Sequence, residues 1–139
     1  MITLLKDYTC YNADIAAIIV CTQENSQRLK VLINAVNNQC FPASEKIILF
    51  KRGTIIPDWF AGYPDWDYRL CSPGDVSNIK WAARAFTSST WVCVVDSQLP
   101  GNCFLLASEK MQMTRIPVKE IRVRASIWRR ITIWKRASL

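Results

Sequence analysis

The sequence TWVCVVDSQLP, residues 90–100, joins a short apolar run directly to a polar turn. The run from Trp91 to Val95 is rich in β-branched and aromatic residues, which predicts a buried strand. This strand ends at Asp96, and the Leu-Pro-Gly sequence at 99–101 prevents its continuation. In open α/β sheets, ligands bind beside the carboxyl ends of the strands. Asp96 is therefore a candidate for the centre of a binding site, and the alternative is that it only opens the turn.

The segments around this stretch alternate between strand patterns and helix patterns. In the expected helices, apolar residues recur at intervals of three and four, whereas the expected strands are short apolar runs. This alternation predicts an α/β fold: a mostly parallel sheet with helices on both faces. No internal repeat or linker divides the chain, so residues 1–139 are expected to form a single domain. Further strands are expected at 14–21, 46–50 and 67–71, helices at 29–39, 76–85 and 102–111, a turn at 72–75, and an irregular segment with one helical turn at 55–66.

The positive charge of the protein is concentrated in residues 114–139. This basic segment contains eight of the 18 Lys and Arg residues but only one of the 11 Asp and Glu residues, so it accounts for the net charge of +7. Its first part, 116–124, alternates as an edge strand does. The part from 125 to 136 fits a helix with Ile127, Ile131 and Trp134 on one face, or a strand, and we favour the helix.

The basic segment also contains Trp128 and Trp134 among its cations. Such a composition suits an anionic membrane surface, where aromatic side chains anchor and cations bind headgroups. Single-stranded nucleic acid is a less favoured partner. The simplest interpretation is that this segment packs its tryptophans inward and leaves its arginines in water.

The composition excludes several classes of site. The chain has six cysteines but no CxxC pair and no histidine, which argues against a zinc site or a histidine-based catalytic triad. We expect buried free thiols instead. No apolar run approaches the roughly 18 residues needed to span a bilayer. The first residues lack the pattern of a signal peptide, so the prediction is a cytoplasmic protein, with membrane association through the basic segment as an addition.

The order of these elements, together with local residues, resembles the nucleotide-sugar-binding domain of GT-A-fold glycosyltransferases of the family-2 type. After the first strand the sequence reads CTQENSQRLKVLINAV, with Glu24 and Asn25 where the family often has Glu or Asn. The pair Phe41-Pro42 stands where the family has an aromatic residue and a proline before its second strand. Asp96-Ser97-Gln98 occupies the place of the family's Asp-x-Asp motif. The resemblance covers residues 14–112.

The resemblance implies that the protein moves a sugar from a nucleotide-sugar donor to an unknown acceptor, with Mn²⁺ or Mg²⁺ at the Asp96 loop. It assigns no catalytic residue, and Glu120 is the only acidic residue after position 113. Four aromatic residues between the second and third strands could stack on a sugar or base, or could fill the core instead. The implied contacts are Thr22, Glu24, Asn25, Gly53, Thr54 and Lys80 for the nucleotide-sugar and Asp96 and Gln98 for the metal, and the aromatic residues are Trp59, Phe60, Tyr63 and Trp66.

The chain departs from the family pattern in two places. Lys51-Arg52 stands where the family has an acidic pair, and these cations could meet phosphate instead. Gln98 replaces the second acid of Asp-x-Asp, which weakens the expected metal site. The alternatives are therefore a catalytically inactive GT-A-like binding or assembly protein, or a basic adaptor that binds membrane or nucleic acid through residues 114–139. The short chain leaves little room for an acceptor-binding half, so an enzyme of this length would need a very small acceptor site or a partner chain. A homo-oligomer is a further expected form of the protein. Its size also suits a compact genome, such as a viral one.

Overall fold

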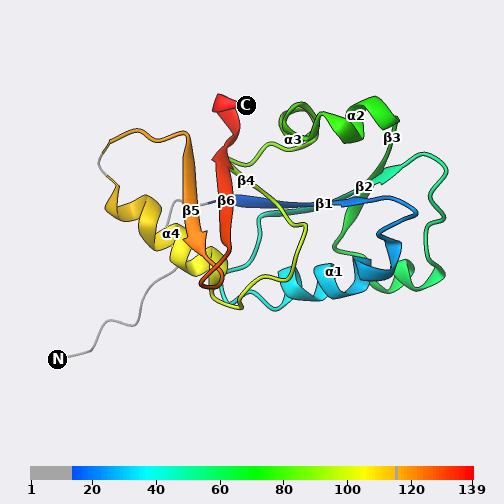
Figure 1. Ribbon diagram of the computed structural model, residues 1–139, viewed down its shortest axis with the longest axis horizontal. Helices are drawn as coiled ribbons and strands as arrows, with labels where there is room; N and C mark the ends of the chain where they lie inside the picture. Colours follow the sequence, from blue (N-terminus) through cyan, green and yellow to red (C-terminus); the bar gives the residue numbers. More distant parts are fainter. Residues whose placement is uncertain (1–13, 115) are drawn as a thin grey trace.

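The computed structural model describes residues 14–114 and 116–139, which form a six-stranded sheet with helices on both faces (Figure 1). Cys10 and Arg115 lie outside the described residues. The strands are β1 (Ile15–Cys21), β2 (Glu45–Lys51), β3 (Asp67–Cys71), β4 (Trp91–Val94), β5 (Glu120–Arg124) and β6 (Arg130–Lys135). The α-helices are α1 (Leu29–Asn37), α2 (Pro73–Ser77), α3 (Ile79–Phe86) and α4 (Cys103–Met113), and the short 3₁₀ helices are η2 (Ser26–Arg28), η3 (Asp58–Gly62) and η4 (Arg136–Ser138).

The strands of the sheet follow the order β3-β2-β1-β4-β6-β5. Neighbours among β3, β2, β1 and β4 run parallel, whereas β6 is antiparallel to β4 and β5 is antiparallel to β6. The expectation of a mostly parallel sheet in an α/β fold is thus confirmed. Because β1 pairs with β2 on one side and with β4 on the other, the direction of winding reverses between β1 and β4.

Two hydrophobic clusters lie on opposite faces of the sheet. Helices α1 and α4 cover one face, with Leu29, Ile33 and Phe104 in that cluster, and α2 and α3 cover the other through residues such as Ala82 and Ala83. Figure 1 shows α2 and α3 on one side of the sheet and α1 on the opposite side. Alternate residues of β1 enter the two clusters, which explains why this strand is apolar along its whole length.

The expectation of a helix at residues 125–136 is wrong. The chain turns at 125–129 and forms β6, which lies in the sheet between β4 and β5. Ile131 and Ile133 point into the core beside α4, as the strand interpretation requires, whereas Ile127 lies in the exposed turn. Pairing on both sides with neighbouring strands supplies backbone hydrogen bonds that a local helical pattern cannot reveal. The edge-strand expectation for 116–124 is confirmed by β5.

The second expected helix differs in its start. Residues 73–77 form α2, and α3 begins only at Ile79. Ser72 caps α2 by accepting a hydrogen bond from the backbone of Asp75 at 3.2 Å, and Pro73 fits the first helical position. Asn78 then caps α3 by accepting from the backbone of Trp81 at 3.3 Å. The expected turn at 72–75 is therefore the beginning of a short helix.

The structure tests the expectations about the cysteines and about helices that could span a membrane. Cys21, Cys71, Cys93 and Cys103 are buried free thiols as expected, whereas Cys40 is a free thiol at the surface. Among the residues that the structure describes, no helix has the length and apolar character that crossing a bilayer requires.

Candidate functional site

The reversal of winding between β1 and β4 creates the place where open α/β sheets bind ligands. Ile18 of β1 is level with Val94 of β4, and β1 continues to Cys21, so both strands end toward the same edge of the sheet. The loop after β1 contains Thr22, Glu24 and Asn25, and the loop after β4 contains Asp96. The fold therefore brings two of the sequence-predicted groups to the same edge of the sheet.

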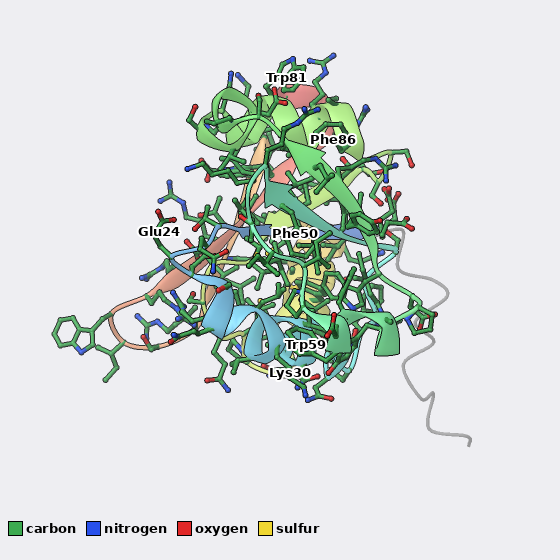
Figure 2. The ribbon with its side chains drawn as sticks, turned by 90° about the vertical axis from the view of Figure 1, so that its right-hand side faces the viewer. Glu24, Lys30, Phe50, Trp59, Trp81 and Phe86 are labelled. Atoms are coloured by element: carbon green, nitrogen blue, oxygen red, sulfur yellow. The ribbon has the colours of Figure 1, made fainter. Side chains whose placement is uncertain are left out.

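The loop after β1 is shaped by Asn25. Its side-chain oxygen accepts a hydrogen bond from the Thr22 backbone at 2.8 Å, and its amide nitrogen donates to the Val20 carbonyl at 3.2 Å. Asn25 makes no side-chain cap to the helical segment that follows. Glu24 is exposed beside it (Figure 2), and a hydrogen bond from the Thr22 side chain, helped by the charge of Lys51, lowers the pKa of its carboxyl group. Thr22 and Asn25 thus organise the loop, and Glu24 is the group it presents to solvent.

The loop after β2 lies against the loop after β1. Gly53 has φ of +92°, a left-handed conformation that favours glycine, and the Thr54 backbone donates to the Lys51 carbonyl at 3.0 Å to close the turn. The backbone of Ile55 donates to the Gln23 side chain at 3.3 Å, which joins the two loops. Gly53 and Thr54 therefore serve the turn itself, next to the loop that carries Glu24.

Two arginines hold the backbone of the Asp96 loop. Arg28, at the end of η2, donates to the Asp96 carbonyl oxygen at 2.8 Å. Arg129, just before β6, donates to the Gln98 carbonyl oxygen. The hydroxyl of Ser97 donates to a carboxylate oxygen of Asp96 at 3.2 Å. Sequence reasoning missed both arginines. Their acceptors are backbone carbonyl oxygens, which every residue has, so the type of the accepting residue does not indicate the contact.

The carboxyl end of β4 opens onto a pocket of about 380 Å³, here called the β4 pocket. Asp96 lies in its wall together with two arginines, and Trp134 contributes an aromatic face. Lys80 of α3 holds its ammonium group 5.3 Å from the centre of the Trp134 ring, a cation–π arrangement that places this predicted residue beside the pocket. The pocket is lined by Ile79, Val94, Asp96, Ser97, Leu99, Arg129, Arg130, Ile131, Thr132 and Trp134.

The donor set at this pocket does not suit a divalent cation. Gln98, the second implied metal ligand, lines a different hollow with Ala125 and Ser126, so the structure does not bring Asp96 and Gln98 into one pocket. Within residues 14–114 and 116–139, no group of three or more His, Cys, Asp or Glu side chains is arranged to hold a metal. Asp96 is the only carboxylate among the lining residues, and two guanidinium groups share the wall with it. Mg²⁺ and Mn²⁺ require several oxygen ligands. The β4 pocket offers one carboxylate, so the divalent cation expected at the Asp96 loop stays a prediction.

The four aromatic residues between β2 and β3 hold η3 against α1. The Trp66 indole donates to Asn37 at 3.0 Å, and the Tyr63 hydroxyl donates to Asn34 at 3.2 Å. The Lys30 ammonium group lies 5.4 Å from the centre of the Trp59 ring, and the two residues are labelled next to each other in Figure 2. Trp66 and Phe60 are buried in the core. These contacts give the cluster a structural role, at a distance in the fold from the β4 pocket.

No family model matches this chain, and no curated protein is similar enough to it to count as a match.

Proposed function

We propose that the protein binds a nucleotide-diphospho-sugar at the carboxyl edge of β1 and β4 and transfers its sugar to an acceptor. The observation that carries this proposal is the position of Asp96, which follows the strand β4 at the reversal of winding and lines the β4 pocket. Ligands of open α/β sheets bind at such a position. The neighbouring loops after β1 and β2 add polar groups on the same edge, with Glu24 beside Lys51.

The chemistry of sugar transfer fits a pocket with cations and one carboxylate. An acceptor oxygen attacks the anomeric carbon of the sugar, the bond from that carbon to the phosphate oxygen breaks, and the nucleotide diphosphate leaves with the electron pair. Positive groups stabilise the charge that develops on the leaving phosphate. Asp96 can accept a hydrogen bond from a hydroxyl of the donor. The proton of the acceptor needs a base, and Glu120 is paired with Arg122 at 3.3 Å on β5, so we assign no residue to that role.

Calorimetric titration with a panel of nucleotide diphosphates and nucleotide-sugars, each with and without Mn²⁺, tests the proposal. We expect one nucleotide-sugar to bind, and we expect Asp96→Ala to lower its affinity at least tenfold by removing a charged hydrogen-bond acceptor. The matched control is Asp65→Ala, because Asp65 is exposed in the turn between η3 and β3. Absence of binding across the whole panel, or equal affinities in the two variants, would refute the proposal.

The exposed tip of the β5–β6 hairpin favours a second function, contact with an anionic membrane surface. Ile127 and Trp128 are 74% and 92% exposed there, and the exposed residues Arg124 and Arg130 flank them. The hairpin extends away from the rest of the molecule in Figure 2. An exposed aliphatic and indole pair ringed by cations is suited to the interface of an anionic bilayer. We infer that the predicted membrane partner would meet this tip, because β6 and most of the basic segment are built into the sheet.

Sedimentation with vesicles tests this second function. We expect binding to vesicles that contain phosphatidylserine and not to vesicles of phosphatidylcholine alone, with loss of binding in Trp128→Ser. Trp81→Ser is the control, because Trp81 is 51% exposed on α3, away from the tip. Deletion of residues 114–139 is unsuitable, since it removes two strands of the sheet. Binding that survives Trp128→Ser, or binding to single-stranded oligonucleotide in place of vesicles, contradicts the membrane role.

A further inference from the structure

The β4 pocket carries positive charge where a metal-dependent site would carry carboxylates. Resting on the function proposed above, we propose that the diphosphate of the donor binds in this pocket without a divalent cation, held by Arg130 and Lys80. Arg129 adds a further positive charge in the pocket wall, and Asp96 supplies the only negative one among the lining residues. The positive charges at the pocket therefore favour binding of a polyanion without a metal ion between the protein and the phosphate groups.

The strand geometry of β6 explains why Arg130 reaches this pocket. Ile131 and Ile133 belong to the cluster beside α1 and α4, so their neighbours Arg130, Thr132 and Trp134 fall on the opposite face, toward α3. Cys93 of β4 is level with Ile133, and because β6 is antiparallel to β4, the same register brings Arg130 to the level of the Asp96 loop. Arg130 is exposed, so its guanidinium group is accessible to a ligand.

Lys80 approaches the same pocket from the other side. It lies in the first turn of α3, next to Ile79, which lines the pocket, and its ammonium group lies over the Trp134 ring. A cation–π contact restricts the position of the ammonium group but leaves its N–H groups free to donate to an anion. Lys80 and Arg130 therefore lie on two separate elements, α3 and β6, and Lys80 lies over Trp134 in the pocket wall.

Each group supplies a different kind of phosphate contact. The planar guanidinium of Arg130 can donate two parallel hydrogen bonds to one phosphate, whereas Lys80 acts as a point charge. The hydroxyl of Thr132 lies in the wall as a further donor. Arg129 is fixed by the Gln98 carbonyl, and its buried Nε atom has no hydrogen-bond partner among the described residues, which leaves uncompensated positive charge behind the loop. Together these cations can balance a diphosphate, the role that a metal would otherwise fill.

Calorimetric titration with inorganic pyrophosphate tests this inference, first in EDTA and then in Mn²⁺. We expect binding in EDTA that Mn²⁺ does not strengthen. Arg130→Gln should weaken it about tenfold or more, and Lys80→Gln about fivefold, since hydrogen bonds between charged groups are among the strongest in proteins. The matched controls are Arg69→Gln on β3, at the opposite edge of the sheet, and Lys119→Gln before β5, neither of which lines the pocket. Circular dichroism of each variant confirms that it is folded.

The Asp96→Asn variant distinguishes the two modes of phosphate binding, because direct binding and metal-bridged binding predict opposite changes in the affinity for pyrophosphate. If phosphate meets cations directly, removal of the nearby carboxylate relieves repulsion, and the affinity for pyrophosphate rises about twofold to threefold for each unit of phosphate charge about 7 Å away in water. If a metal bridges Asp96 and phosphate, the same variant loses binding. Pyrophosphate binding that requires Mn²⁺, or that is unchanged in both Arg130→Gln and Lys80→Gln, overturns the inference while the proposed function stands. Failure of every nucleotide, nucleotide-sugar and pyrophosphate to bind overturns both.

Discussion

Glu45 anchors the loop that precedes the central strand, and its replacement should destabilise the protein in a pH-dependent way. Glu45 is the first residue of β2, and one of its carboxylate oxygens accepts hydrogen bonds from the Ser88 backbone at 2.8 Å, the Ser89 backbone at 2.6 Å and the Ser89 hydroxyl at 2.5 Å. Ser44 extends this network to the Ser89 hydroxyl at 2.7 Å. The carboxylate therefore links β2 to the segment that leads into β4.

The magnitude follows from the number and kind of these bonds. In Glu45→Gln an amide oxygen still accepts the bonds but without the charge, and a charged bond contributes about 1 kcal/mol more than a neutral one, so we expect a loss of about 1–2 kcal/mol at pH 7. In Glu45→Ala the Ser89 backbone, in a residue that is only 4% exposed, loses its acceptor. Buried donors without partners are costly, so we expect a loss of about 2–4 kcal/mol.

The pH dependence of the Glu45 variant has a definite sign. Burial raises the pKa of the Glu45 carboxyl group, but hydrogen bonds from Ser89 and Ser88 outweigh burial, so the pKa in the folded protein lies below the ordinary value of 4.5. A lowered folded pKa contributes stability that is present above the unfolded pKa and is lost as the pH falls through the folded pKa. The difference between the wild type and Glu45→Gln should therefore be full at pH 7 and should shrink below about pH 4.

Urea denaturation followed by tryptophan fluorescence at pH 7 and at pH 3 measures both effects. Asp65→Asn is the control, because it removes an exposed carboxylate for which the structure shows no hydrogen-bond partner among the described residues. A loss smaller than about 0.5 kcal/mol for Glu45→Gln at pH 7 would refute the reasoning, since that is the scatter of ordinary surface substitutions. An equal loss at both pH values would show that the charge is not responsible.

Three further outcomes can be checked with the same protein. Gln39→Leu should lower the unfolding free energy, measured by urea denaturation, by about 2–4 kcal/mol. The buried Gln39 side chain bonds to backbone groups of α1 and of the start of α4, and the substitution leaves those groups unpaired. A loss below about 1 kcal/mol would contradict this. In a timed reaction with a thiol reagent, Cys40 should react rapidly, whereas Cys103, whose pKa burial raises to about 11, should react only after urea is added; similar rates for the two would be inconsistent with the fold. Trp128→Ser should leave the unfolding free energy within about 0.5 kcal/mol, whereas Ile133→Ala should lower it by about 3 kcal/mol, and comparable effects would place the hairpin tip in the core.

The parts of the fold that could be predicted are those specified by local sequence. The apolar run before Thr22 and the spacing of Leu29, Leu32, Ile33 and Val36 identify β1 and α1, because a buried strand and an amphipathic helix each leave a periodic signature. The segment at 125–136 lacks such a signature, since its isoleucines satisfy a helical and a strand pattern equally. The structure of this segment is decided by the pairing of β6 with β4 and β5. The pairing with β4 joins residues far apart in the sequence, so a short stretch of sequence cannot reveal it.

In the candidate site, too, the features set by local sequence could be predicted and those set by long-range contacts could not. The position of Asp96 could be predicted because it follows directly from the end of a strand pattern. Its surroundings could not, because Arg28 is 68 residues away from the carbonyl it contacts, and Arg129 is 31 residues away from its own. The charge of the C-terminal segment was visible in the sequence, but only the insertion of β6 beside β4 shows that part of it faces Asp96.

The order of the sheet has a consequence for how the protein folds. β5 precedes β6 in the chain and lies at the edge of the sheet, paired with β6, which in turn pairs with β4. The β5–β6 hairpin should therefore form from its local contacts and dock on β4 as one unit, since contacts near in sequence form faster than distant ones. Pulsed hydrogen exchange would detect this as simultaneous protection of β5 and β6. The β4 pocket would be absent from every intermediate that precedes this docking, because β6 supplies much of its wall, so ligand binding could report the docking step.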